Sequence, residues 1–174
     1  AKTLAAVGEE LGEANESKVK YPFHAAPVTE KDRKITIDDD GAITIPAVAC
    51  SKPTKSTGKI IFMPCVLGGK QLHYSRLGNP QEFEYTFDAP RAGKYALTAL
   101  LVSPSWGQHL LVRVNGAEKP VDIPVPLTVG MWQWTKPVEI TLAKGKNVLT
   151  FTTHSVENVI RGLTIKEFRL KPAK

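Results

Sequence analysis

Three tryptophans stand in short polar stretches that contain glycine, where an indole could meet a ligand. Trp106 lies in "SPSWGQH", close to Gln108. Trp132 and Trp134 flank a single glutamine in "TVGMWQW". An indole face is apolar and electron-rich, whereas neighbouring amide groups donate and accept hydrogen bonds. This combination suits the non-covalent binding of a polar molecule that also has an apolar face.

Groups arranged for catalysis are missing from the sequence. It contains neither a GxSxG nucleophile elbow nor an HExxH zinc motif. Glu82 and Glu84 alternate on one predicted strand, as solvent-facing residues do, and no pair of acids stands out as acid and base. We therefore predict that the chain is not an enzyme.

Cys50 and Cys65 lack the CxxC spacing of a metal site. Both lie in apolar segments that could form neighbouring strands. A single disulfide would form in an oxidising compartment, whereas two buried free thiols would act as small hydrophobic residues. The sequence leaves these alternatives open.

The composition is that of a globular domain, with 174 residues of which 42% are hydrophobic. Apolar runs such as residues 95–102 are too short to cross a membrane. The net charge is +6, but Lys and Arg are scattered rather than lined up as a basic stripe. We predict no nucleic-acid or membrane partner, while an acidic polysaccharide remains compatible with the charge. The chain opens "AKTLAAVGEE" without Met or a signal-peptide pattern, which we interpret as the start of a piece of a larger protein.

The sequence changes character at residue 34. Residues 1–33 combine a helix-favouring stretch with a proline-containing linker. From residue 34 to 174, short runs of alternating residues are separated by Gly, Pro and Asn turns, without a helical crossover. This pattern predicts an all-β fold in which two antiparallel sheets form a sandwich.

Individual runs carry more specific predictions. "KITIDDDGAITIPAV" indicates a hairpin around "DDDG", and "PVEITLAKGKNVLTF" indicates two strands joined by "AKGK". "QEFEYTFDAP" places three aromatic residues on one face, which predicts a half-buried strand. The continuous apolar run "GKIIFMPCVL" favours a buried strand, whereas the prolines of "KPVDIPVPL" favour a sheet edge.

The stretch from Glu82 to Phe168 resembles the galactose-binding-like jelly-roll β-sandwich of carbohydrate-binding modules, particularly families 6 and 35. These modules share a sequence of strand and turn motifs, written approximately "aGtYtLtv", "l.vdG", "TGgW..W" and "v.v.L.aGtntl.f". The matching positions are Ala89-Pro90, Gly93, Tyr95, Leu97, Asn115-Gly116, Thr128, Gly130, Trp134, Leu142, Gly145, Asn147 and Leu149. The resemblance implies this fold for about half of the chain, and sugar binding as its function.

Two departures from the family pattern matter for the site. Carboxylates near the first and last strands bind a structural calcium in many members, but Thr164 stands close to where the aspartate of the last strand would be. We therefore predict no cofactor, with a structural calcium as the alternative left open, and a solvated turn rather than an ion site at Asp38 to Gly41. Met131 replaces the usual sugar-facing tryptophan, so Trp132 becomes the predicted platform and Trp134 the predicted core residue.

Loops at one end of a rigid sandwich are where binding residues are expected. Four loops qualify, namely residues 68–79, 103–109, 129–133 and 154–162. The predicted ligand-binding residues are Trp106, Gln108, Trp132, His154, Asn158, Arg161 and Tyr74.

The resemblance and the loop tryptophans together give the predicted function. We expect a non-catalytic carbohydrate-binding module, secreted or periplasmic, that anchors neighbouring domains of a larger chain to a polysaccharide or oligosaccharide. The alternative is a structural or protein-docking sandwich that binds no sugar.

Overall fold

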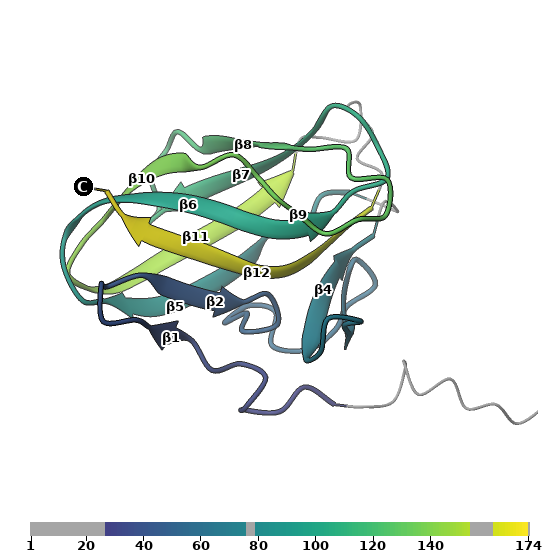
Figure 1. The fold of residues 1–174 in the computed structure, drawn as a ribbon, viewed down its shortest axis with the longest axis horizontal. Coiled ribbons are helices and arrows are strands. Elements are labelled where there is room, and N and C mark those ends of the chain that lie inside the picture. Colours follow the sequence, from purple (N-terminus) through teal and green to yellow (C-terminus); the bar gives the residue numbers. More distant parts are fainter. Residues whose placement is uncertain (1–26, 76–78, 154–161, 174) are drawn as a thin grey trace, which may run out of the picture.

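Two antiparallel sheets make up the computed structural model, which describes residues 27–75, 79–153 and 162–173. The eight strands of sheet A are β1 (Thr36–Ile37), β2 (Ile43–Pro46), β3 (Ile60–Pro64), β4 (Lys70–Tyr74), β6 (Gly93–Val102), β9 (Gln133–Trp134), β10 (Val138–Leu142) and β12 (Leu163–Pro172). The four strands of sheet B are β5 (Phe83–Ala89), β7 (Gln108–Val114), β8 (Val121–Val125) and β11 (Gly145–Thr153). Figure 1 looks onto β6 and β12 of sheet A, with β5 and β11 of sheet B behind them.

The predicted all-β sandwich is therefore confirmed. The described residues contain no helix, and so none that could cross a membrane. The N-terminal helix predicted before residue 27 falls outside the described residues.

Sheet A is organised around β12. Its residues 164–172 pair with β6 along one side. Its other side is shared end to end by β4 and β2. A register irregularity between Ile165 and Glu167 lies where one neighbour gives way to the other. Such a bulge bends the strand, which helps a single strand to serve two partners.

An aromatic cluster occupies the space between the sheets. The ring of Phe151 in β11 stacks on Phe168 in β12 at a centroid distance of 4.4 Å. The same ring stacks on Phe83 in β5 at a centroid distance of 5.4 Å. Tyr85 meets all three rings in tilted or edge-on contacts, and its hydroxyl donates a 2.7 Å hydrogen bond to the carbonyl of Ala47. All four aromatic side chains are fully buried.

Several local predictions hold. The strands β1 and β2 form the hairpin expected around "DDDG", with Gly41 at a φ of 82°. The alternating residues Phe83, Tyr85 and Phe87 all face the core. The proline-containing strand β8 lies at the edge of sheet B, because it pairs with β7 alone in the part of the chain that the structure describes.

The strands joined by "AKGK" are β10 and β11, but they do not pair with each other. The first belongs to sheet A and the second to sheet B. The buried side chain of Asn147 fixes this crossing. It accepts a hydrogen bond from the amide of Ala143 at 3.0 Å and donates to the carbonyls of Ala143 and Gly145.

The buried strand predicted for "GKIIFMPCVL" is wrong. Strand β3 lies at the edge of sheet A, and among the described strands it pairs with β4 alone. Ile60 is buried, but Ile61 is exposed and Phe62 is half-buried. A continuous apolar run cannot show whether a strand has neighbours on both sides, which is why the sequence misled here.

Cys50 and Cys65 are both buried and both free. Of the two alternatives left open, the structure has the pair of thiols. Burial raises the pKa of the Cys50 thiol to about 12, so this group is neutral near neutral pH.

The aromatic cluster gives a stability prediction. Replacing Phe151 with Ala is expected to lower the free energy of unfolding by about 3–5 kcal/mol, because the cavity cannot collapse between two sheets held by other rings. Phe151→Leu fills more of the space and should lose clearly less. Urea denaturation monitored by circular dichroism measures both. Equal losses for the two variants would contradict the idea that a ring stack joins the sheets.

Candidate functional site

The loops 103–107 and 126–132 lie side by side at one end of the sandwich. The first connects β6 to β7, and the second leads from β8 to β9. They are joined by three hydrogen bonds between Ser103 and Thr128. The amide of Ser103 donates to the Thr128 hydroxyl at 2.9 Å, and the carbonyl of Ser103 accepts from the Thr128 amide at 3.1 Å and from the Thr128 hydroxyl at 3.2 Å. The two loops therefore form one surface.

Gln108 lies beneath this surface. Its side-chain amide donates a 2.7 Å hydrogen bond to the Ser103 hydroxyl, and the residue is 2% exposed. Its side-chain oxygen, also buried, has no hydrogen-bond partner within the described chain. We name Ser103, Gln108 and Thr128 the polar floor. Gln108 was predicted to touch the ligand, but in this structure it supports the loops from below.

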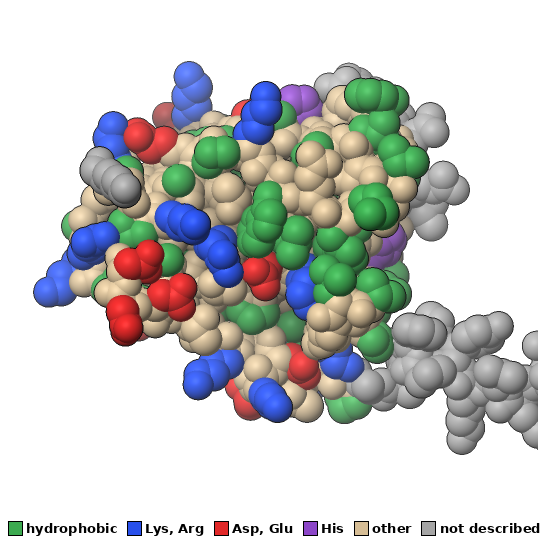
Figure 2. Space-filling view, viewed as in Figure 1, with side chains coloured by type: hydrophobic (Ala, Val, Ile, Leu, Met, Phe, Trp, Pro, Cys, Tyr) green, Lys and Arg blue, Asp and Glu red, His purple; other side chains and the backbone are tan. Residues whose placement is uncertain are grey.

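Apolar side chains project from the same loops. Trp106 is 82% exposed, Val129 79% and Met131 72%. Trp132 next to them is half-buried. We call these four residues the rim patch. Figure 2 shows hydrophobic side chains gathered at the right-hand end of the molecule, where these loops lie. Exposed apolar side chains that cluster on a surface mark a place of contact with other molecules.

Val129 stands in a backbone conformation that suits it poorly. Its φ is 48° and that of Gly130 is 85°, and the Met131 amide donates a 2.9 Å hydrogen bond to the Thr128 carbonyl. Positive φ at both central positions is the pattern of a type I′ turn, which favours Asn-Gly. A β-branched residue is strained there, and strain of this kind concentrates at binding sites.

Of the remaining predicted site residues, the structure describes Tyr74 alone. Tyr74 is fully buried, and its hydroxyl donates to the Gln81 carbonyl at 3.0 Å and accepts from the Gln81 amide at 2.8 Å. Its ring cannot meet a ligand, so the ligand-binding role predicted for Tyr74 is corrected to one in packing. His154, Asn158 and Arg161 lie outside the described residues.

The placement predicted for Trp134 is wrong. Its side chain lies on the outer face of sheet A and is 38% exposed, with the Arg169 guanidinium carbon 5.4 Å from its ring centroid. It borders a shallow hollow of about 360 Å³, which we call the Trp134 groove. The groove is lined by Ala96, Thr98, Trp134, Pro137, Arg169 and Lys171.

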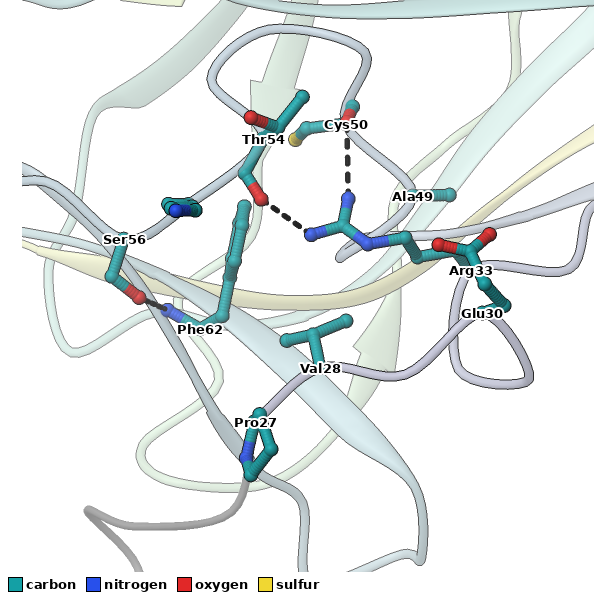
Figure 3. A pocket seen from close by; sticks show the side chains of 10 residues that line it. Pro27, Val28, Glu30, Arg33, Ala49, Cys50, Thr54, Ser56 and Phe62 are labelled. Carbon is teal, nitrogen blue, oxygen red and sulfur yellow. Dashed lines mark hydrogen bonds between the residues drawn. The ribbon is translucent and has the colours of Figure 1, made fainter.

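A pocket of about 670 Å³ lies at the side of the sandwich, where residues 27–33 pack against the body (Figure 3). Arg33 crosses it and donates to the carbonyls of Cys50 at 3.1 Å and Thr54 at 2.5 Å. Its guanidinium also lies 5.5 Å from the centre of the Phe62 ring. These bonds tie residues 27–33 to the sandwich, so we assign Arg33 a structural role.

At the position where a calcium-binding aspartate was expected, this chain has Thr164. Thr164 in β12 contacts Nδ1 of His73 at 3.0 Å, and burial lowers the pKa of His73, so this imidazole is neutral near neutral pH. Within the described ranges, no group of three or more His, Cys, Asp or Glu side chains could hold a metal ion. The expectation that the chain needs no cofactor stays a prediction.

No protein-family model matches this sequence, and no curated protein matches it. Solved structures do match it. One is the C-terminal family 6 carbohydrate-binding module of LamC, a laminarinase from Zobellia galactanivorans, with a TM-score of 0.59 and 19% identity, covering 75% of this chain and 98% of the module. A second is a family 35 module from Clostridium thermocellum, with a TM-score of 0.59 and 15% identity, covering 74% and 97%.

A third match is the family 6 module of Cellvibrio mixtus lichenase 5A, whose structure was determined in complex with cellotriose. It has a TM-score of 0.57 and 19% identity, and the match covers 75% of this chain and 97% of the module. At these identities the likeness establishes the fold. The sandwich is the one found in carbohydrate-binding modules of families 6 and 35, as the sequence motifs indicated.

The strained turn yields a prediction. Val129→Asn creates the Asn-Gly pair that a type I′ turn favours, and it should raise the free energy of unfolding by about 1 kcal/mol. Met131→Asn is the matched control, because Met131 is similarly exposed without a positive φ. Urea denaturation compares the two. A Val129→Asn protein no more stable than Met131→Asn would show that the turn holds no strain.

Proposed function

We propose that this chain is a non-catalytic carbohydrate-binding module that uses the rim patch to hold a polysaccharide or oligosaccharide. One observation carries the proposal: the Trp106 indole is 82% exposed beside Val129 and Met131, on two loops that hydrogen bonds hold together. The fold shared with modules of families 6 and 35 supports it.

The chemistry of the patch fits a sugar ring. An indole face packs against the C–H groups of a pyranose, which are apolar and slightly positive. Covering the exposed indole with a ligand is favourable, because burying apolar surface lowers the free energy by about 25 cal/mol per Å². Loops fixed by buried hydrogen bonds also lose little conformational freedom when a ligand binds.

The wider role follows from the same proposal. We infer that the module anchors neighbouring domains of a larger, secreted or periplasmic protein to a polysaccharide, without a cofactor. Val129 and Met131 contribute apolar surface and no hydrogen-bonding side-chain groups, a feature that also suits docking against another protein. Protein docking without sugar binding is therefore the alternative function.

Affinity electrophoresis through gels that contain a panel of polysaccharides tests the proposal. The wild-type chain should be retarded by at least one polysaccharide, and Trp106→Ala should weaken that binding roughly tenfold, since an aromatic contact contributes about 1.5 kcal/mol. Val66→Ala is the control, because Val66 is 84% exposed in the turn between β3 and β4.

Both substitutions lie on the surface and should change stability by less than about 0.5 kcal/mol. The proposal fails if no polysaccharide retards the wild-type chain. It fails equally if Trp106→Ala binds as tightly as the wild type, as the control Val66→Ala should.

A further inference from the structure

The pocket of about 670 Å³ that Arg33 crosses, which we call the side pocket, has largely apolar walls. Pro27 and Val28 line it on the side of the N-terminal segment, and Cys50 and Phe62 line it on the side of the sandwich (Figure 3). The Cys50 thiol is neutral, because burial raises its pKa to about 12, so it adds to the apolar surface. Cavities of about 300–1,000 Å³ with such walls are typical of small-molecule sites.

The guanidinium of Arg33 is held firmly at this pocket. Figure 3 shows it between the backbone of Cys50 and Thr54, whose carbonyls accept its hydrogen bonds at 3.1 and 2.5 Å. The Phe62 ring centre lies 5.5 Å from its central carbon. These two hydrogen bonds use two of the five N–H donors of an arginine. The side chain is therefore fixed in place while it still has donors to offer.

The charge of Arg33 is not neutralised by the protein. Among the described residues, no acid forms an ion pair with it. Backbone carbonyls accept its hydrogen bonds but carry no net charge. Glu30 and the exposed Lys55 also line the pocket, so that two cations stand against one acid. The side pocket is therefore an apolar hollow with an excess of positive charge.

We propose that the side pocket binds a small organic acid, in which a carboxylate is attached to an apolar body. The carboxylate accepts hydrogen bonds from the N–H groups of Arg33 that the backbone does not use, and such charge-assisted bonds are among the stronger ones in proteins. The apolar body lies against Val28 and Phe62, where it leaves water. A bare anion or a neutral apolar molecule would use only one of these two features.

The remaining polar groups of the pocket favour this class of ligand over a sugar. The Ser56 hydroxyl already accepts a 2.9 Å hydrogen bond from the amide of Phe62. A sugar would present many hydroxyl groups to walls that are mostly apolar, and burying a polar group without a partner is unfavourable. The side pocket also shares no residue with the rim patch, so this inference stands or falls separately from the proposed carbohydrate binding.

Isothermal titration of the full chain tests the inference with two probe acids, 1-naphthylacetate and decanoate. Each is compared with its neutral amide, 1-naphthylacetamide or decanamide, and acetate serves as the anion without an apolar body. At least one of the two acids should bind. Its amide should bind about tenfold or more weakly, because a hydrogen bond to a charged group is stronger than one between neutral groups. Acetate should show no measurable binding.

Two variants change the pocket in different ways. Val28→Trp fills it with a larger side chain and leaves the hydrogen bonds of Arg33 in place, so it should abolish binding of the acid. Arg33→Gln removes the charge and should weaken binding about tenfold or more. Thermal unfolding of each variant reports whether the sandwich is intact. Should Arg33→Gln unfold, Val28→Trp decides the question.

Arg91→Gln is the matched control for Arg33→Gln. Arg91 is exposed, lies outside the side pocket and likewise donates to a backbone carbonyl, that of Asp40 at 3.2 Å. This control and Trp106→Ala in the rim patch should both bind the acid as the wild type does.

Any of three results would overturn the inference. The first is that neither probe acid binds the wild-type chain. The second is that an amide binds as tightly as its acid, which would mean that Arg33 takes no part. The third is that Val28→Trp binds as tightly as the wild type, or that Arg33→Gln loses no more affinity than Arg91→Gln, which would place the acid elsewhere on the surface.

Discussion

The stacked rings of Phe83, Phe151 and Phe168 hold the two sheets at one distance and in one register. Phe151 stands at the centre, with one neighbour in its own sheet and another across the interface. Because flat rings fill this space face to face, neither sheet can slide without opening a void. Every loop at the ends of the sandwich is attached to strands that this contact positions.

The rim patch and the Trp134 groove use two different parts of that frame. The rim patch lies on loops, whereas Trp134 and Arg169 stand on the outer face of sheet A. The core residues of β12 and β6 point inward on the same strands whose other residues line the groove. Alternation along a strand thus lets one segment pack in the core on one face and line a surface groove on the other. A groove on paired strands is also held more rigidly than a surface on loops.

Alternation also explains how much the sequence could predict. Phe83, Tyr85 and Phe87 were placed correctly, because a long strand with aromatic residues at every second position buries the face that carries them. Trp134 was misplaced because β9 has only two residues, too few for a pattern to show which face is buried. Gln108 continues the inward series of Leu110 and Val112, but its polarity suggested a surface position. The sequence does not show that the side-chain amide of Gln108 is buried with a hydrogen-bond partner nearby.

The hydrogen bonds of the polar floor couple the loops 103–107 and 126–132. Ser103 and Thr128 are 25 positions apart, yet each satisfies the backbone of the other. A displacement of the loop that carries Trp106 is therefore resisted by the opposite loop as well. Substitutions in either loop will therefore alter the shape that both present. Sequence variation in this part of the chain should consequently be interpreted in pairs rather than one site at a time.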